Sequence, residues 1–218
     1  NPTTGVIRHN ITPPSAMAPT GDWETMADDE PMKPTTQWDP TKYLNFWVIR
    51  PGGNTIQNGG IADLLGYAQF PDNSGLSGLS ASGGAANTDG LVCVYNAMGT
   101  IAEDDGSFVL NSTYNLGRTM THEAGHWLGL RHIWGDTSTC PATNSYTDKD
   151  YCADTPAANG PNYTCNLSAN SCTTAPFNDQ VQNYMDYTPD ACMDTFTQDQ
   201  KDRMIAVMTN SPRRAELN

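Results

Sequence analysis

The sequence has few basic residues. Its 218 residues include 11 lysines and arginines against 24 aspartates and glutamates, which gives a formal net charge of −13. Binding to nucleic acid requires a basic surface, so this balance argues against nucleic acid as a partner. The chain also lacks an apolar run of about 18–20 residues, the length of a membrane-spanning helix, and we expect no membrane span. It starts at Asn1 without a recognisable signal peptide, as expected of a mature or trimmed chain.

The cysteines never occur as a C-x-x-C pair, which argues against zinc binding by thiolates. Five of the six lie from Cys140 to Cys192, in a segment with few apolar residues. An even number of cysteines in a loop-rich segment favours disulfides, and the alternative is six reduced thiols. Disulfides form in oxidising compartments, so we expect a secreted, extracellular protein.

Histidine is scarce too, yet three of the four histidines fall in one motif, H-E-x-x-H-x-x-G-x-x-H. On a helix, His122 and His126 lie one turn apart on the same face and can bind one Zn²⁺. His132 would lie about 9 Å further along a continuing helix, so the helix must end before it. Gly129 can adopt the left-handed conformation that ends helices. Three protein ligands leave a fourth position for water, which indicates a catalytic site.

Glu123 lies beside the first histidine and can take a proton from a zinc-bound water. The motif therefore predicts metal-assisted hydrolysis of peptide bonds, with Glu123 as general base and then general acid. A chance match is the alternative for a bare H-E-x-x-H, and the extended form argues against it. Two further alternatives are a catalytically silent zinc- or calcium-binding adhesion or binding module, and a structural domain stapled by disulfides and calcium. Retention of Glu123 argues against the silent module.

Three short segments combine β-branched and aromatic residues, as strands do. The predicted strands are residues 43–49, 66–70 and 91–95, and the zinc helix is predicted from about residue 116 to 128. Residues 1–36 are rich in proline, and we expect extended chain with little regular structure there.

A second helix is predicted near the end of the chain. Thr197-Gln198-Asp199-Gln200 is a capping box, followed by an apolar face of Met204, Ile205, Val207 and Met208. Strands before the zinc helix and a helix late in the chain indicate an α+β or α/β class with a small, irregular second half.

Acidic residues crowd the segment from Asp148 through Asp150 to Asp154. Alternating side-chain and carbonyl oxygens can wrap a hard cation such as Ca²⁺. A solvated acidic loop is the alternative, and the spacing does not decide between them. The segment is no EF-hand loop, because the glycine and the terminal glutamate are missing.

The extended histidine motif resembles that of the metzincin clan of zinc endopeptidases. Metzincins also carry a methionine in a turn beneath the zinc, and Asn183-Tyr184-Met185-Asp186-Tyr187 supplies one. From about Gly5 onward, further short sequence segments resemble the pappalysin family, which includes ulilysin-like, secreted prokaryotic members. They are Trp38-Asp39-Pro40 to Trp47, His132-Ile133-Trp134-Gly135-Asp136, Asp154-Thr155-Pro156, residues 183–187 and Asp190-Ala191-Cys192-Met193.

This resemblance implies a single metalloprotease catalytic domain, residues 1–218, of the α+β class. A twisted mixed sheet and the active-site helix would form an upper subdomain, residues 1–132. An irregular, disulfide-stapled lower subdomain, residues 133–218, would hold the methionine turn and the C-terminal helix. The implied partners are protein or peptide substrates, and we expect a monomer. The family's catalytic domain usually opens with a helix and a strand before the part that matches Gly5, and this chain does not show them.

The resemblance also implies roles for individual residues. Zinc would bind His122, His126 and His132, Met185 would be the methionine of the turn, and Tyr187 would stabilise the oxyanion. Calcium would lie near Asp150, the Cys152 carbonyl, Asp154 and Thr155. The implied disulfides are Cys140–Cys172 and Cys165–Cys192, and we predict that the remaining Cys93 and Cys152 pair with each other.

Substrate specificity is where the sequence departs from the family pattern. Members that favour a basic residue after the scissile bond use an acid directly before the cysteine that matches Cys192. Here Ala191 holds that position and Asp190 lies one residue earlier. We therefore expect Asp190 and Ala191 at the specificity pocket, without a defined preference for arginine.

Overall fold

The computed structural model describes residues 5–9, 32–49, 64–140, 150–173 and 177–217. Three short strands form one mixed sheet in the order β1-β3-β2. β1 (Phe46–Ile49) runs parallel to β3 (Leu91–Val94), and β2 (Gly66–Ala68) runs antiparallel to β3. These strands start or end a few residues inside the predicted ones. All four side chains of β3 are buried, as expected of the central strand.

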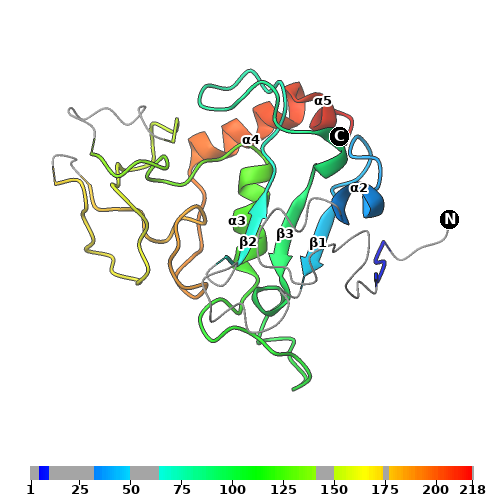
Figure 1. The fold of residues 1–218 in the computed structure, drawn as a ribbon. Coiled ribbons are helices and arrows are strands. Elements are labelled where there is room, and N and C mark those ends of the chain that lie inside the picture. The colour runs from blue at the N-terminus through cyan, green and yellow to red at the C-terminus, as the bar shows by residue number, and fades with distance from the viewer. Residues whose placement is uncertain (1–4, 10–31, 50–63, 141–149, 174–176, 218) are drawn as a thin grey trace.

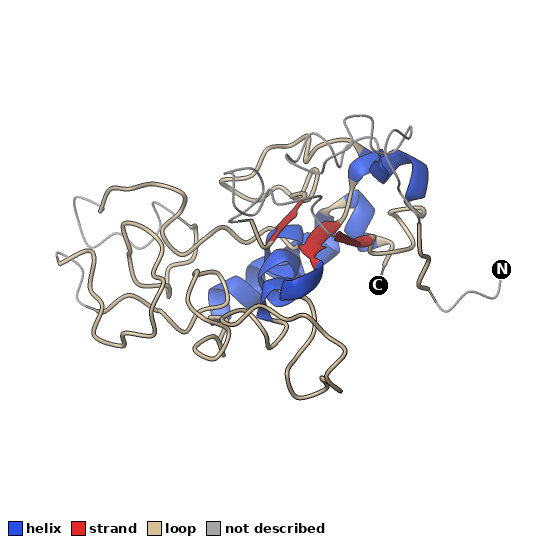
Figure 2. Cartoon of the chain, turned by 60° about the horizontal axis from the view of Figure 1, so that its bottom comes forward, coloured by secondary structure: helices blue, strands red, loops and turns tan. Residues whose placement is uncertain are grey.

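Helix α3 (Arg118–Trp127) packs against β2 and β3. The last two helices of the chain, α4 (Gln198–Asn210) and α5 (Pro212–Ala215), lie near the C-terminal end of α3 (Figure 1). Two 3₁₀ turns, η2 (Ala86–Thr88) and η3 (Tyr95–Ala97), flank β3. Residues 150–173 lie to one side of the sheet and consist of loops and turns (Figure 2). The architecture is therefore α+β, as predicted. Among the described residues, no helix has the length and apolar character needed to cross a membrane.

One helix lies where the sequence predicted irregular chain. α2 (Met32–Thr36) is a single turn whose Thr35 and Thr36 hydroxyls donate to the Met32 carbonyl. The Met32 side chain is buried against Trp47 and Ile49 of β1, so tertiary packing stabilises a segment whose composition disfavours a helix. Of the rest of this segment, only residues 5–9 are described, so the prediction for residues 1–4 and 10–31 lies outside the described residues.

The predicted capping box of α4 is present: the Gln200 N–H donates to the Thr197 hydroxyl, and the Thr197 N–H donates to the Gln200 side chain. The predicted apolar face is only partly correct. Val207 is fully buried, but Ile205 is 53% exposed. Instead, α4 turns the polar Gln200 and Arg203 inward, where both make hydrogen bonds.

Buried charges join the C-terminal segment to the C-terminal end of α3. Arg214 is fully buried and donates two hydrogen bonds, of 2.5 and 2.8 Å, to the Asp89 carboxylate. Its guanidinium lies 3.8 Å from the centre of the Trp127 ring, and Trp127 Nε1 donates to the same carboxylate. Arg213 also pairs with Asp89, at 2.9 Å. The start of β3, the end of α3 and α5 therefore share one ion-pair network.

Two disulfides join Cys140 to Cys172 and Cys165 to Cys192, the same two pairs that the family resemblance implied. The predicted third pair is wrong, because Cys93 and Cys152 are both free and buried. Cys93 lies in the central strand near Glu123, whereas Cys152 lies in the acidic loop near Asp150, so the two thiols have different surroundings.

Both free thiols are expected to resist modification in the folded protein. Burial raises the pKa of Cys93 and of Cys152 to about 12, so neither forms the reactive thiolate at neutral pH. Mass spectrometry after treatment with iodoacetamide at pH 8 should find no label on the native protein and two labels after unfolding without reductant. Two labels on the native protein would contradict the burial of these thiols.

Candidate active site

Helix α3 carries the first two histidines, and both of its ends are defined by specific contacts. At its start, Asp190 Oδ2 accepts hydrogen bonds from the N–H groups of Leu116 and Arg118, at 2.8 and 3.1 Å. A carboxylate there satisfies free N–H groups and complements the helix dipole. At its end, the Leu130 N–H donates to the Gly125 carbonyl and Gly129 has φ of +88°. This is a Schellman motif, and it turns the chain back as the spacing of the histidines requires.

The three motif histidines meet at one point. Their Nε2 atoms lie 3.1 Å (His126 to His122 and to His132) and 3.2 Å (His122 to His132) apart. Three nitrogens bound to one tetrahedral zinc at about 2.0–2.1 Å would lie about 3.3 Å apart. They are the only His, Cys, Asp or Glu cluster with this spacing among the described residues.

The opposite ring nitrogens show why these imidazoles fit a cation. Nδ1 of His122 contacts the Tyr184 carbonyl at 2.7 Å, and Nδ1 of His126 contacts the Leu130 carbonyl at 2.8 Å. Nδ1 of His132 contacts the Asp136 carboxylate. Because these oxygens only accept, each Nδ1 must carry the proton. Three Nε2 lone pairs then converge without a donor between them, which is the arrangement that a metal ion satisfies.

Burial keeps His122 and His126 neutral. Burial, and then the neighbouring His126, lowers the pKa of His122 well below its ordinary value. Burial lowers the pKa of His126 to about 4. Neutral imidazoles are the form that binds metals, so the described residues fit zinc.

Two neighbours of His132 were not assigned a role from the sequence. Asp136 orients the ring through Nδ1 and also pairs with Arg131 at 3.2 Å. The Trp134 ring stacks on the His132 ring, with 4.3 Å between centroids and 2° between planes. In the sequence, only their place in the family-like segment Ile133-Trp134-Gly135-Asp136 pointed to these two residues.

Glu123 is 4% exposed and lies beside the histidine cluster in the same cleft. Among the described residues, its Oε2 atom has no hydrogen-bond partner. Burial raises the pKa of its carboxyl to about 8. A carboxyl that is buried, unpaired and close to a metal-binding cluster has the properties of a group that exchanges protons.

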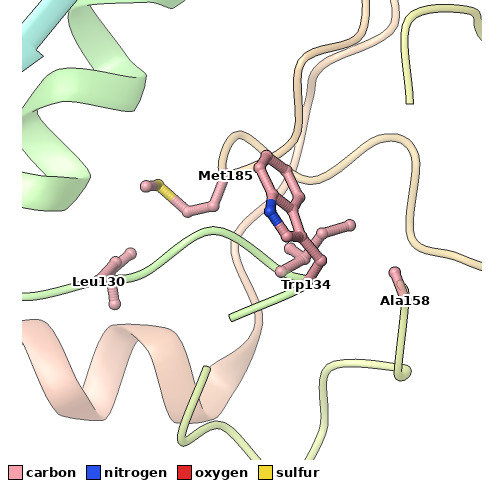
Figure 3. Packing of buried hydrophobic residues seen from close by; sticks show 5 residues of the cluster. Leu130, Trp134, Ala158 and Met185 are labelled. Carbon is pink, nitrogen blue, oxygen red and sulfur yellow. The ribbon is translucent and has the colours of Figure 1, made fainter. Parts of the chain in front are cut away.

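Met185 lies beneath the zinc helix. It is fully buried, its N–H donates to Asn183 Oδ1, and its carbonyl accepts from the Ile133 N–H. Its side chain extends toward α3, with Trp134 and Ala158 on the other side (Figure 3). A Cβ on Gly125 would lie 2.5 Å from Met185 Sδ, so only glycine leaves room for this contact.

Tyr187 lies over the histidine cluster. Its ring centroid is 4.9 Å from that of His132 and 5.6 Å from that of His122. Burial, followed by the charge of Glu123, raises the pKa of its hydroxyl to about 12. The hydroxyl is therefore a hydrogen-bond donor throughout the neutral range. Tyr114 contacts the main chain of the same residue, since its hydroxyl donates to the Tyr187 carbonyl at 2.9 Å.

The three histidines, Glu123 and Tyr187 line a cleft of about 840 Å³. One wall comes from β2 and the chain around it, and the other includes Tyr163, Tyr187 and Asp190. Asp190 Oδ1 is buried without a hydrogen-bond partner among the described residues. Ala191 is exposed and does not line the cleft.

The acidic loop lies elsewhere. Asp150 and Thr155 are both 2% exposed, and neither Asp150 Oδ2 nor Thr155 Oγ1 has a hydrogen-bond partner among the described residues. Asp154 Oδ2 accepts from the Asp199 N–H at the start of α4, and the Cys152 carbonyl accepts from the Thr155 N–H. The predicted Asp148 lies outside the described residues.

The histidine cluster and Glu123 lie on and beside a helix that packs against a mixed sheet. This is the type of site found in metallopeptidases that bind one metal ion. Comparison with known proteins identifies the family. The model of the M43 peptidases, described as pregnancy-associated plasma protein-A, matches residues 28–209. The chain belongs to this family, the pappalysins.

Solved structures and curated sequences agree with this assignment. Mature mirolysin of Tannerella forsythia, solved with a cleaved peptide, has 40% sequence identity and a TM-score of 0.62, over 83% of this chain and 58% of that chain. An extracellular metalloprotease of Colletotrichum graminicola is 33% identical over 186 residues, 84% of this chain and 55% of its own length. One of Neurospora crassa is 31% identical over 184 residues, 84% of this chain and 54% of its own length. The chain thus spans about half the length of these curated relatives.

Proposed function

We propose that the chain is a secreted, zinc-dependent endopeptidase. The observation that carries the proposal is the convergence of three Nε2 lone pairs beside the buried carboxyl of Glu123. Membership of the pappalysins supports hydrolysis of peptide bonds over a silent binding module. The two disulfides and the names of the extracellular relatives support secretion. A monomer and a division at residues 132/133 into two subdomains stay predictions.

His122, His126 and His132 would hold the zinc, which when bound polarises the scissile carbonyl and acidifies a water. Glu123 lies beside them, takes the proton of the attacking water and passes it to the leaving amine. A cation nearby favours the ionised carboxylate that this first step requires, against the effect of burial. The Tyr187 hydroxyl, protonated at neutral pH, donates a hydrogen bond to the developing oxyanion.

The substrate backbone would pair with the open edge of β2. The Gln69 N–H donates to Gly90, and the Leu65 carbonyl accepts from Val94, so residues 65, 67 and 69 face β3. The N–H and C=O groups of Gly66 and Ala68 therefore point the other way, into the cleft that both residues line. Among the described residues, no strand pairs with that edge. An extended peptide can add there through main-chain hydrogen bonds.

Asp190 would contribute to the specificity pocket, and Ala191 would not. Asp190 lines the cleft and uses Oδ2 at the start of α3, while Oδ1 is buried and has no hydrogen-bond partner among the described residues. A buried acceptor without a donor selects a substrate group that supplies one. The side chain of Ala191 is exposed outside the cleft, which argues against a direct contact.

Calcium is proposed for the loop of Asp150, Cys152, Asp154 and Thr155. Two buried oxygens, Asp150 Oδ2 and Thr155 Oγ1, have no hydrogen-bond partner among the described residues. They support the proposal, because such atoms are costly unless a ligand satisfies them.

Zinc-loaded protein should therefore melt about 5–10 °C higher when Ca²⁺ is about 100-fold above its dissociation constant. Differential scanning calorimetry with and without millimolar Ca²⁺, with Mg²⁺ as the control, measures this. An unchanged melting temperature would remove the calcium site.

The enzymatic proposal is tested by cleavage of casein and gelatin by wild type and by Glu123→Ala, with and without a zinc chelator. We expect cleavage by wild type that the chelator abolishes and added zinc restores. Glu123→Ala should bind zinc but cleave about 10²–10⁴-fold more slowly, the usual contribution of a general base. If zinc-bound wild type leaves both proteins intact, a binding module is the better account. Equal cleavage by Glu123→Ala would exclude the proposed base.

A further inference from the structure

Gly66, the first residue of β2, faces the side chain of Glu123 on α3. A Cβ built on Gly66 would lie 2.8 Å from Glu123 Cγ and 3.0 Å from Glu123 Oε1. It would also lie 2.7 Å from the Val92 carbonyl oxygen of β3. Carbon atoms in ordinary contact stay about 3.5–4.0 Å apart, so no side chain fits between this strand and Glu123.

Backbone conformation does not explain the glycine. Gly66 is paired within β2, opposite Cys93, and is not among the glycines with positive φ. Any residue can adopt such an extended conformation, and glycine inside a strand weakens it. The remaining reason for glycine here is space, because the Val92 carbonyl and the Glu123 side chain both lie where a Cβ would stand.

The Glu123 carboxylate has no hydrogen bond on Oε2 among the described residues. Histidines of this site differ in this respect, since each has a fixed partner on Nδ1. The direction of the Glu123 side chain is therefore set by what it packs against, and Gly66 supplies that surface. The same residue turns its N–H and C=O toward the open edge of the sheet.

We propose that Gly66 is a positioning residue: the missing side chain seats the Glu123 carboxylate between β2 and the histidine cluster. The single strand β2 then orients both the substrate backbone and the Glu123 carboxylate that transfers the proton. This inference rests on the proposed function, because it assigns Gly66 to the base of that reaction.

The first test compares Gly66→Ala with Gly160→Ala. Gly160 has no atom of the described residues within 4 Å of an added Cβ and no positive φ, so it is a matched control for the chemical change. For Gly66→Ala we expect one zinc per chain, KM within about threefold of wild type and kcat lowered about 100-fold, the effect of displacing a reacting group by about 1 Å. Gly160→Ala should match wild type in all three. An unchanged kcat for Gly66→Ala, or a loss explained by lost zinc or raised KM, would overturn the proposal.

A double-mutant cycle tests the contact without relying on activity. Gly66→Ala is made in wild type and in Glu123→Ala, where Cγ and Oε1 are absent and only the Val92 carbonyl remains close. The melting temperature should fall clearly less in the Glu123→Ala background, and folding only in that background would also support the contact. An equal fall in both backgrounds, or failure to fold in both, would assign the clash to Val92 and overturn the proposal. If zinc-loaded wild type cleaves nothing, the proposed function fails while the cycle still reports on the contact.

Discussion

Arg214→Ala is expected to lower the free energy of unfolding by about 3 kcal/mol. Removing one partner of a buried ion pair costs about 3–5 kcal/mol, because the other charge stays buried. We expect the lower end of that range, since Arg213 still pairs with Asp89 at 2.9 Å. The substitution also removes the guanidinium that covers the Trp127 ring.

Urea unfolding of zinc-loaded protein, followed by circular dichroism, measures this loss. The melting temperature should fall by about 6–12 °C for a chain of this size. Lys201→Ala is the matched control, because Lys201 is an exposed basic residue on α4, and its effect should stay within about 0.5 kcal/mol. A loss for Arg214→Ala no greater than for Lys201→Ala would show that the network contributes no stability.

Asp136→Ala is expected to weaken zinc binding by about 10–100-fold, although Asp136 does not touch the metal position. The carboxylate holds the proton on His132 Nδ1 and thereby turns Nε2 toward the other two histidines. Without it, the ring can rotate or carry its proton on Nε2, where it blocks metal binding.

Competition with a fluorescent zinc chelator measures this affinity. Glu103→Ala, which removes an exposed acid from a loop outside the cleft lining, is the control for the change of net charge. Equal zinc affinity for wild type and Asp136→Ala would contradict the role given to this hydrogen bond.

The parts of the site that the sequence predicted are those encoded over short distances. His122, His126 and Gly129 lie within eight residues, so helix geometry alone predicts their arrangement. The capping box of α4 is local in the same way. His132 could be included because a helix break was the only way to bring it back.

Contacts between distant parts of the chain leave no local pattern in the sequence. Asp190 reaches the start of α3 across 72–74 residues, and Arg214 reaches Asp89 across 125. In a sequence, a charge that will be buried and paired looks like one that will be solvated. The pairing of Cys93 with Cys152 failed for a similar reason, because cysteine parity says nothing about distance.

Apolar patterning also misassigned part of α4. The pattern placed Ile205 inside, but the inner face holds Gln200 and Arg203. Arg203 reaches the Gly129 carbonyl at 2.8 Å, so α4 contacts the end of the zinc helix through a hydrogen bond. A long polar side chain can cover a buried surface and still find an acceptor, which an apolar count does not register.

In the proposed reaction, the histidine cluster and Glu123 hydrolyse internal peptide bonds. The most direct measurement is mass spectrometry of a peptide library with blocked termini after incubation with zinc-loaded protein. We expect new termini at internal bonds, produced by wild type and not by Glu123→Ala. Intact peptides in the presence of zinc-bound wild type, or the same fragments from Glu123→Ala, would contradict it.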